Sequence, residues 1–406
     1  MKPSIRPDAA DHRQTLIFWI DSFRYDPRPL NSPEEHQLVY KILIRPLLFL
    51  LHPELAHKLI LKLLRLLYVI PGISFFVRLL TGKRVADLPV SLLGRDFPNP
   101  VGLAAGLDKN ADCPRAFSDM GFGWVELGTV TPKKQRGNPG KRLFRYSEQA
   151  ALINRMGFPS AGVDRFLGKL QRQKRRGIVG INIGKNRTTP ISNATDDYLL
   201  AMNAAYPYAD YIAVNISSPN TSGLRDLQNE VHLEKLLQTL KNEQVILTKT
   251  RRHYVPLVLK IAPDVDDDSI KVIAKQLLKH KWDGVIATNT TITRPGMEHY
   301  DNVPDEGGLS GAPLKDLSTE VVRKLYNQLQ GRIPIIAAGG IFTANDAWEK
   351  LVAGADLVQI YTSFIYEGPA VVRRIVRGLE RRVRTGGFAS LTEALEKARS
   401  GIHLMR

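Results

Sequence analysis

Residues 210–228 read DYIAVNISSPNTSGLRDLQ. The apolar run from Tyr211 to Val214 has the composition of a buried β-strand, and it stops at Asn215, which precedes two serines, a proline and a second asparagine. In sheets and barrels of parallel strands, chemistry gathers at the carboxyl ends of the strands. The stretch therefore predicts a buried strand that delivers hydrogen-bonding side chains to a site. Taken alone, it is equally compatible with an ordinary polar turn.

Seven other short apolar runs share the character of this strand. The eight candidate strands are Val101–Ala105, Trp124–Thr129, Ile178–Ile183, Tyr211–Asn215, Leu257–Ile261, Gly284–Thr288, Ile335–Ala338 and Leu357–Tyr361. Segments with helical periodicity lie between most of them, such as Ile270–Leu278, Thr319–Leu329 and Ala344–Ala353. Eight strands alternating with helices predict a (β/α)8 barrel, the TIM-barrel fold. A doubly wound α/β sheet is the competing fold, but no GxGxxG motif follows the first strand.

The composition is that of a globular chain with a strong positive charge. Of its 406 residues, 43% are hydrophobic and 24% are charged, so the chain is long enough for a full core with an appendage. The single cysteine, Cys113, excludes an internal disulfide and is compatible with a reducing compartment. The formal net charge of +17 indicates contact with a polyanion, whether nucleic acid, anionic lipid or a phosphorylated cofactor.

The position of the basic residues favours lipid. Eight of them lie between Gln37 and Arg84, against the single acid Glu54, and this segment is also the most leucine-rich part of the chain. Leucine combined with lysine and arginine is typical of a membrane surface, whereas nucleic-acid surfaces usually mix basic residues with polar and aromatic ones. The longest uncharged run, from Leu66 to Val77, is too short for a helix that spans a bilayer.

Periodicity divides this segment into two or three short amphipathic helices between Tyr40 and Leu80, with breaks at Pro53 and Pro71. We therefore predict an amphipathic helical module at residues 37–88 that lies on a membrane surface. A helical layer packed on the main domain would show the same pattern. The other predicted parts are an unassigned extension at 1–36, a catalytic barrel at 89–390 and a C-terminal helical tail at 391–406.

Small and polar residues follow most of the candidate strands. Lys109 lies in AAGLDKN after the first strand, and Lys260 lies in the fifth. Gly339-Gly340 and Thr362-Ser363 follow the last two strands, the position where such barrels bind phosphate through backbone N–H groups. With at least four asparagines at other strand ends, they predict one mouth for a phosphorylated planar cofactor beside a small amide-rich ring. No cluster of histidine and cysteine has the spacing of a metal site, so no metal is expected.

Nine motifs resemble those of the dihydroorotate dehydrogenase family, in the same order. They are AAGLDKN, ELGTVTP, GNPGKRLFR, INRMGF, VNISSPNTSGLRDLQ, KIAPD, ATNTT, GGLSG and AAGGI. The likeness runs from about Gln37 to Gly378. It points to the membrane-associated, quinone-dependent class 2 form, because HPELAHKL precedes the barrel and because Ser218 stands where the soluble forms have a cysteine. The resemblance implies oxidation of (S)-dihydroorotate to orotate in pyrimidine biosynthesis, with one FMN and with ubiquinone or menaquinone as acceptor.

The resemblance also implies roles, position by position. Ser218 matches the base that takes a proton from C5 of dihydroorotate while C6 gives hydride to N5 of the flavin, under a lid formed by residues 219–227. The residues that match the substrate site are Lys109, Asn154, Arg155, Met156, Gly157, Phe158, Asn215, Asn220, Asn289 and Thr290. The residues that match FMN contacts are Ala105, Gly106, Lys109, Thr129, Asn182, Asn215, Lys260, Thr288, Gly311, Gly340, Tyr361 and Thr362. Those that match the inner end of the quinone passage are His57, Arg145 and Tyr361.

The extension at 1–36 does not align with the family, and neither the targeting sequence nor the single spanning helix of mitochondrial forms is seen. We therefore expect a peripheral protein on the cytoplasmic face of a bacterial inner membrane, with no nucleic-acid partner. Two other functions stay open. A flavin barrel acting on pyrimidines in RNA would use the charge of +17, but it would need a cysteine acid and Cys113 is poorly placed. A non-catalytic phosphate-binding barrel would be colourless when purified.

Overall fold

The structure is a computed structural model that describes residues 40–81, 85, 87–173 and 175–403. Several parts of the sequence-based division lie outside these residues: the extension at 1–36, the start of the helical module at 37–39, the basic residues Lys83 and Arg84, and the end of the tail at 404–406. The described ranges contain the whole predicted barrel except residue 174. They also contain most of the helical module.

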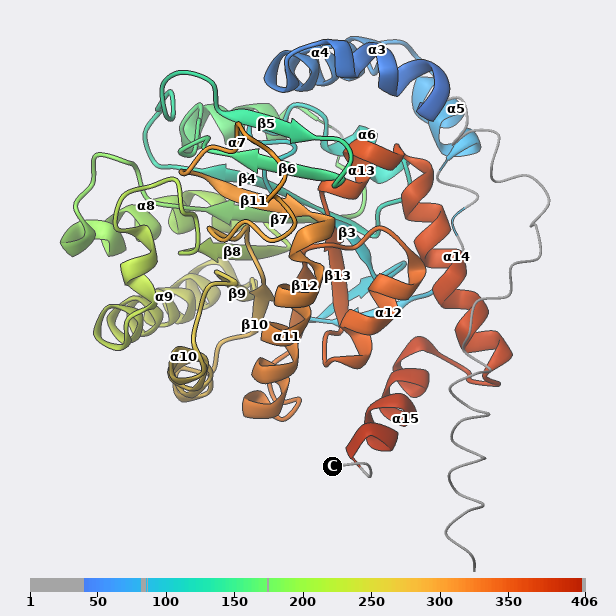
Figure 1. The fold of residues 1–406 in the computed structure, drawn as a ribbon. Helices are drawn as coiled ribbons and strands as arrows, with labels where there is room; N and C mark the ends of the chain where they lie inside the picture. The colour runs from blue at the N-terminus through green and yellow to red at the C-terminus, as the bar shows by residue number, and fades with distance from the viewer. Residues whose placement is uncertain (1–39, 82–84, 86, 174, 404–406) are drawn as a thin grey trace, which may run out of the picture.

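Eight parallel strands close into a barrel at the centre of the chain (Figure 1). Their order around the barrel is β10-β12-β13-β3-β4-β7-β8-β9. The bounds are β3 (Val101–Leu103), β4 (Trp124–Val130), β7 (Ile178–Ile183), β8 (Tyr211–Asn215), β9 (Leu257–Ile261), β10 (Gly284–Ala287), β12 (Ile335–Ala338) and β13 (Leu357–Ile360). All eight predicted strands are present, with ends that differ from the prediction by two residues or fewer. The predicted (β/α)8 barrel is therefore confirmed, and the doubly wound sheet is wrong.

Helices cover the outside of the barrel and explain the continuous apolar runs of its strands. Every residue of β8 and of β9 is buried, as expected for parallel strands enclosed on both faces. The helices are α6 (Pro114–Asp119), α7 (Val163–Gln171), α8 (Ala194–Ala205), α9 (Glu230–Arg251), α10 (Asp267–Lys279), α11 (Lys315–Leu329), α12 (Ala344–Val352), α13 (Thr362–Glu367), α14 (Ala370–Thr385) and α15 (Leu391–His403). Short 3-10 helices are η3 (Ile191–Asn193), η4 (Tyr206–Tyr208), η5 (Leu224–Gln228) and η6 (Ala312–Leu314).

Two of these helices begin at N-cap side chains that hydrogen-bond to the first helical turn. The Asp266 side chain accepts from the Ser269 backbone N–H at 2.8 Å and begins α10. Thr343 and Asp346 form a reciprocal capping box that begins α12. These caps fix the helices that the periodicity alone indicates. The three helices named from the sequence are confirmed as α10, α11 and α12, with Ala353 as the C-cap of the last.

Two antiparallel sheets were not predicted. β1 (Val90–Leu92) and β2 (Arg95–Phe97) form a hairpin. β5 (Leu143–Tyr146) pairs with β6 (Ala151–Asn154), which pairs in turn with β11 (Gly308–Gly311). The β6–β11 pairing joins segments more than 150 residues apart, Asn154 opposite Gly308. Such a long-range pairing leaves no periodicity in the sequence that could predict it, and it brings Asn154 to the mouth of the barrel.

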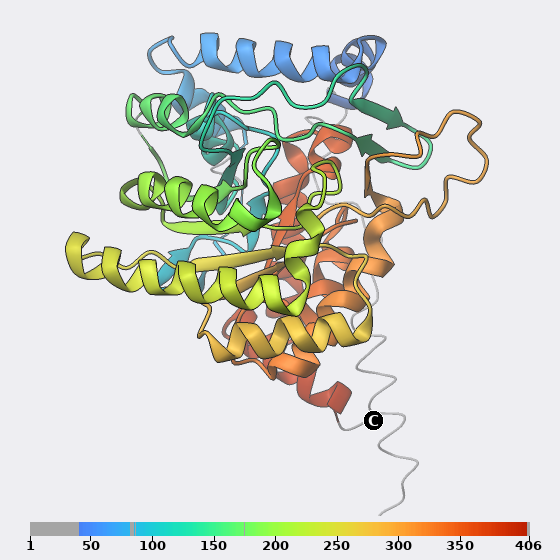
Figure 2. The same ribbon diagram turned by 90° about the vertical axis from the view of Figure 1, so that its left-hand side faces the viewer.

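The helical module crosses one end of the barrel, over the sheet of β5 and β6 (Figures 1 and 2). Its elements are η1 (Tyr40–Ile44, a short π-helix), α3 (Arg45–Leu50), α4 (Pro53–Leu67) and α5 (Ile73–Leu80). As predicted, Pro53 begins α4, and the second break ends at Gly72, whose positive φ of 86° precedes α5. Polar contacts attach it to the barrel: buried Asp119 of α6 accepts from Tyr68 at 3.2 Å and from Ser74 at 2.5 Å.

The outer face of the module is apolar and exposed. Leucine, isoleucine, valine and phenylalanine side chains there are between 43% and 83% exposed, namely Ile42, Leu43, Ile44, Leu47, Leu50, Leu55, Leu59, Leu63, Leu66, Val69, Ile70, Phe75, Phe76, Leu79 and Leu80. A packed helical layer would bury such residues, so the module is both attached to the barrel and apolar toward the outside. None of the helices in the described ranges is long and apolar enough to cross a bilayer.

Candidate active site

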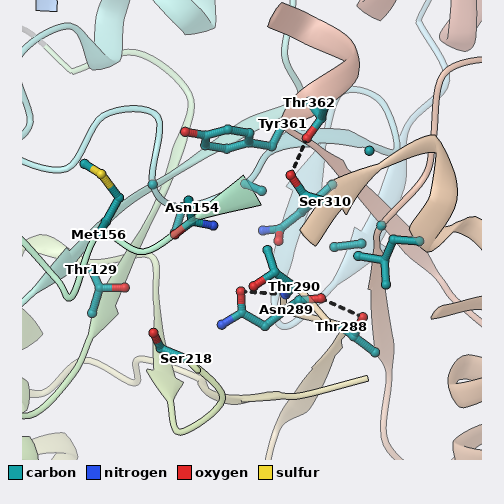
Figure 3. A pocket seen from close by; sticks show the side chains of 18 of the residues that line it. Thr129, Asn154, Met156, Ser218, Thr288, Asn289, Thr290, Ser310, Tyr361 and Thr362 are labelled. Atoms are coloured by element: carbon teal, nitrogen blue, oxygen red, sulfur yellow. Dashed lines mark hydrogen bonds between the residues drawn. The ribbon is translucent and has the colours of Figure 1, made fainter. Parts of the chain in front are cut away.

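A cavity opens at the carboxyl ends of the barrel strands (Figure 3). It contains about 1170 Å³ of space when the part open to solvent is counted. Its lining includes Leu143 of β5, Asn154 of β6, Ser310 of β11 and His57 of α4. The unpredicted sheet and the helical module therefore both help to enclose the mouth that the strand-end pattern predicts.

Ser218 lies in the loop after β8 and lines this cavity, on the side opposite Tyr361 (Figure 3). Only 5% of the residue is exposed. Its hydroxyl oxygen accepts a hydrogen bond from the Asn220 backbone N–H at 3.3 Å. A hydroxyl held in this way can still donate a proton to, or take one from, a molecule in the cavity. Pro219 and Asn220, the next residues of the loop, line the cavity as well.

Arg225 fastens the loop that carries Ser218 to the neighbouring strand ends. Its guanidinium pairs with Asp264, after β9, at 2.8 Å. The same group donates to the backbone oxygens of Ser217 at 3.2 Å and Thr290 at 3.0 Å. Three contacts from one side chain hold this loop, which belongs to the predicted lid at residues 219–227, against the neighbouring strand ends.

Asparagine side chains from four segments meet in the cavity. Asn220 donates to Asn154 Oδ1 at 3.0 Å, which links the loop after β8 to β6. Asn289, after β10, donates to Ser217 Oγ at 3.0 Å. Asn215 donates to Thr129 Oγ1 at 3.1 Å. These bonds preorient amides that can present donors and acceptors to a planar ring.

A buried carboxylate organises the floor of the cavity. Glu126 of β4 is fully buried and pairs with Lys260 of β9 at 3.5 Å. Its two oxygens also accept bonds of 2.8 Å from Asn182 of β7, Tyr211 of β8 and Gln359 of β13. Five strands thus meet at one carboxylate, and the charge of Lys260 is balanced without solvent.

Lys109 and His57 occupy the side of the cavity nearest the helical module. The Lys109 amine donates to the backbone oxygen of Gly106, and burial lowers the pKa of Lys109 to about 8. His57 Nε2 lies 2.7 Å from the backbone oxygen of Leu107. Burial, assisted by the nearby Lys109 charge, lowers the pKa of His57 to about 4, so the imidazole is neutral near pH 7.

A turn of glycines and hydroxyls fits a phosphate at the far side of the cavity. We call Gly339, Gly340, Thr362 and Ser363 the phosphate cradle; all four line the cavity. Gly340 has a φ of +71°, and a Cβ there would overlap Lys315, so the turn packs directly on the start of α11 and requires glycine. Buried Ser363 Oγ has no hydrogen-bond partner among the described residues. An unbonded buried hydroxyl beside bare backbone suits an anionic ligand.

Most residues that the sequence assigns to the site line the cavity. They are His57, Ala105, Gly106, Lys109, Thr129, Asn154, Met156, Gly157, Phe158, Asn215, Ser218, Asn220, Lys260, Thr288, Asn289, Thr290, Gly311, Gly340, Tyr361 and Thr362. Three assigned residues do not line it. Asn182 lies behind the floor, Arg155 pairs with Glu306 at 2.9 Å, and Arg145 donates to the backbone oxygen of Phe49 at 2.5 Å.

The sequence assignment omits three polar residues with central positions. Glu126 and Gln359 bond to each other in the floor, and Ser310 lies 2.9 Å from the Thr362 hydroxyl beside the cradle (Figure 3). Glu126 is the one charged residue in WVELGTV and Gln359 the one amide in LVQIY, so each is a signal of a buried polar contact within an apolar strand. Ser310 lies in GGLSG, where the resemblance implies a role only for the last glycine, Gly311. Within the described ranges, no three His, Cys, Asp or Glu residues are grouped to hold a metal ion.

Comparisons with known proteins agree on one family. The family model described as dihydroorotate dehydrogenase matches residues 87–383. A protein of Idiomarina loihiensis named dihydroorotate dehydrogenase (quinone) is 52% identical over 337 residues, which are 83% of this chain and 99% of that protein. A protein of the same name from Nitrosomonas europaea is 52% identical over 345 residues, 85% of this chain and 99% of that one.

A solved structure supports the same assignment. The crystal structure of the dihydroorotate dehydrogenase of Eimeria tenella with ferulenol matches with a TM-score of 0.76 and 39% identity, over 84% of this chain and 94% of that chain. The family model covers all eight barrel strands, and the first relative matches over 83% of the chain. The chain therefore belongs to the dihydroorotate dehydrogenase family, whose fold and flavin dependence it shares, and it resembles the quinone-linked members.

Proposed function

We propose that this protein oxidises (S)-dihydroorotate to orotate in pyrimidine biosynthesis and passes the electrons to a membrane quinone. The observation that carries the proposal is one cavity lined by Ser218, by the phosphate cradle and by the amides of Asn154, Asn220 and Asn289. The close relatives that bear the name dihydroorotate dehydrogenase (quinone) support the same activity. A phosphorylated flavin at the cradle leaves the amide-rich end of the cavity for the pyrimidine ring.

Ser218 is the proposed base for the C5 proton of the substrate. A serine hydroxyl is a weak base in water, so it needs a hydrogen-bonded, shielded position. Its exposure of 5% and the lid fastened by Arg225 provide that shielding. The soluble alternative, a cysteine base, has no candidate in the cavity, since Cys113 is buried and does not line it.

The substrate is held by the amides and by Lys109. Asn154, Asn220 and Asn289 present donors and acceptors for the ring carbonyls and N–H groups, and the Lys109 ammonium suits the carboxylate. This set would orient a bound ring with C5 toward Ser218. Binding geometry of this kind supplies a large part of the rate by holding the reacting atoms in place.

The flavin we assign to the cavity is FMN, because the cradle fits one phosphate. When bound, FMN supplies the two-electron acceptor for the hydride from C6 and delivers those electrons to the quinone. The buried Glu126 pair holds Lys260 at the floor of the cavity, where its cation would favour negative charge on a bound flavin ring. The Gln359 amide, with its oxygen unbonded among the described residues, faces the same part of the cavity.

We assign membrane docking and the quinone entrance to the helical module. Its exposed apolar face suits the acyl boundary, and the Lys58 and Arg65 side chains, 69% and 65% exposed, suit anionic headgroups. His57 of α4 and Tyr361 both line the cavity, so they are the proposed inner end of the passage, with Arg145 beneath α3. The cytoplasmic face of a bacterial inner membrane is the proposed location, in keeping with relatives from Idiomarina loihiensis and Nitrosomonas europaea.

An anaerobic absorbance spectrum before and after addition of dihydroorotate tests the proposal. We expect a yellow protein whose flavin band bleaches within seconds, and orotate in equal amount. A yellow protein that does not bleach would leave the flavin barrel and point to other pyrimidines, including those in RNA. A colourless protein that stays colourless after incubation with FMN would overturn the enzyme assignment.

A further inference from the structure

Lys350 of α12 is a fully buried lysine outside the cavity. Its amine donates to the Lys315 backbone oxygen at 2.7 Å, to Ser318 Oγ at 2.5 Å and to Thr319 Oγ1 at 2.6 Å. All three partners are neutral oxygens in the first turns of α11. An ammonium buried without a counter-ion is costly, so its position requires an explanation.

The surroundings make a positive charge on Lys350 still less favourable. The amine lies at the N-terminal end of α11, where the helix dipole disfavours cations. Lys315 is close by and adds repulsion, while its own amine takes the acids of α12, Asp346 at 3.0 Å and Glu349 at 2.9 Å. Burial and this repulsion lower the pKa of Lys350 to about 7.

The other charged groups around α12 do not neutralise this amine. Asp316 on α11 and Glu349 and Asp346 on α12 act on Lys350 only at a distance, and they raise its pKa by less than burial lowers it. From the packed helices α14 and α15 come two more cations: Arg382 donates to Asn345 Oδ1 at 2.5 Å, and Arg399 donates to the Leu351 backbone oxygen at 2.9 Å. The described residues show no ion pair for Lys350. A negative charge in direct contact range of the Lys350 amine would therefore have to belong to a bound molecule.

The phosphate cradle lies directly in front of this amine. Ser318 Oγ accepts from Lys350, and its single proton lies within hydrogen-bond reach of the backbone oxygens of Leu314 at 2.8 Å, Lys315 at 3.0 Å and Gly339 at 3.1 Å. One hydroxyl therefore lies between the amine and the cradle. Gly340 packs so closely on Lys315 that a Cβ would overlap the Lys315 backbone. A phosphate in the cradle would therefore be separated from the Lys350 amine by a single layer of backbone and hydroxyl groups.

We infer that Lys350 is a positioning residue that recognises the phosphate of the flavin from behind the cradle, and that a proton is taken up on Lys350 when the phosphate binds. Phosphate and ammonium stabilise each other across the cradle in low dielectric. Lys350 thereby favours FMN over flavins without phosphate. The inference rests on the proposed FMN site, but it concerns binding alone and not oxidation of dihydroorotate.

The test compares FMN with riboflavin, which has the same ring and no phosphate. Flavin is removed from the full-length protein, and each flavin is titrated back while its fluorescence is followed between pH 7 and 9. One linked proton predicts that FMN affinity falls with rising pH by up to about tenfold per unit, whereas riboflavin affinity stays level. Phosphate itself is dianionic in this range, since its second pKa is about 6, so the linked proton belongs to the protein.

Lys350→Met, with a side chain of similar length and no charge, is the decisive variant. We expect its preference for FMN over riboflavin to fall at least about tenfold at pH 7 and to lose its pH dependence. Lys324→Met is the matched control on the partly exposed face of α11, and it should leave both unchanged. Equal loss of both flavins, or an unchanged preference, would make Lys350 a structural residue only.

A second measurement needs no variant. Calorimetry of the wild-type protein at pH 8, in two buffers of different ionisation heat, counts the protons taken up with each flavin. We expect uptake with FMN and none with riboflavin; equal uptake with both, or none with either, would overturn the inference. A protein that takes up a proton with FMN yet is not reduced by dihydroorotate would overturn the proposed reaction and leave this inference standing.

Discussion

The barrel and the helical module treat their apolar residues in opposite ways. In the barrel, strand residues such as Ile212 and Leu259 are fully buried, and polar side chains among them, such as Asn182 and Tyr211, bond to Glu126. In the module, Leu50 is 83% exposed and Leu66 is 56% exposed. The barrel satisfies its own surface, whereas the module keeps an apolar surface that only another phase or partner can cover. We therefore expect changes in the barrel mouth to affect chemistry and changes on the module face to affect association.

The largest effect that separates the two regions is expected from Ser218→Ala. Loss of a general base typically costs about 10²- to 10⁴-fold, so reduction of the flavin by dihydroorotate should slow by that factor. Stopped-flow absorbance under anaerobic conditions measures this half-reaction. Reoxidation by quinone and binding to vesicles should not change, because both depend on the module. Ser218→Cys is expected to keep part of the rate, and a normal rate in Ser218→Ala would move the base to another residue or to water.

The next effect should appear only at the membrane. Leu59, Leu63 and Leu66 are about half exposed on α4. Replacing all three by glutamate removes roughly 1 kcal/mol of further apolar burial at each site, so vesicle affinity should fall about 100-fold or more. Sedimentation with vesicles of anionic lipid measures it. Reduction of quinone held in vesicles should fall in parallel, while reduction of the flavin by dihydroorotate stays at the wild-type rate.

A matched substitution on the barrel sharpens the same comparison. Leu200 of α8 is 52% exposed, as much as the α4 leucines, but it lies on the barrel surface. Leu200→Glu should leave vesicle affinity unchanged if the face of the module is the docking surface. If Leu200→Glu and the α4 variant lost equal vesicle affinity, the module face would not be the docking surface.

The sequence predicted the parts of the site that follow a strand directly. Ser218, Asn215 and Lys260 stand at or just after apolar runs, so the strand pattern alone brings them to one mouth. The sequence could not predict what depends on distant pairing. The β6–β11 ladder brings Asn154 to Gly308, and the position of α4 brings His57 to the cavity. Neither contact leaves a local periodicity in the sequence. Only the resemblance to the family predicted that Asn154 and His57 belong to the site.

The floor of the cavity illustrates a different limit of sequence reading. Glu126 and Gln359 lie inside strands, where a polar residue among apolar neighbours marks each position but does not indicate which residue it contacts. The Gln359 amide donates to the Glu126 carboxylate, and this bond forms only because β4 and β13 both point these side chains into the barrel. Strand periodicity gives alternation but not which face is inside when both faces are buried. Barrel closure therefore had to be known before this pair could be found.

The pH dependence of substrate binding isolates Lys109. Its pKa of about 8, lowered by burial, means that the charge is present below pH 8 and lost above it. If Lys109 holds the carboxylate of dihydroorotate, kcat/KM should fall above pH 8 by up to about tenfold per unit through KM. Lys109→Met should raise KM at pH 7 about tenfold and abolish this alkaline fall. A fall that survives in Lys109→Met would belong to another group.

The smallest effect is expected where the two regions join. Glu54 of α4 pairs with Arg142 of the barrel and with Lys58 at 2.9 Å, and the Arg142 bond lowers the pKa of Glu54 to about 2. A carboxyl with a lowered pKa stabilises the folded state above its ordinary pKa, so this contribution is lost as pH falls from about 4.5 toward 2. Glu54→Gln should lower the free energy of unfolding by about 1 kcal/mol or less at pH 7. Thermal unfolding at several pH values measures it, and Lys58→Met, which leaves the Arg142 bond intact, is the control.

The same variant tests whether the join affects the chemistry. If the module is held mainly by its packed face and by Asp119, Glu54→Gln should leave reduction of the flavin by dihydroorotate unchanged. Loss of that activity would instead mean that the join, and not only the barrel, shapes the cavity.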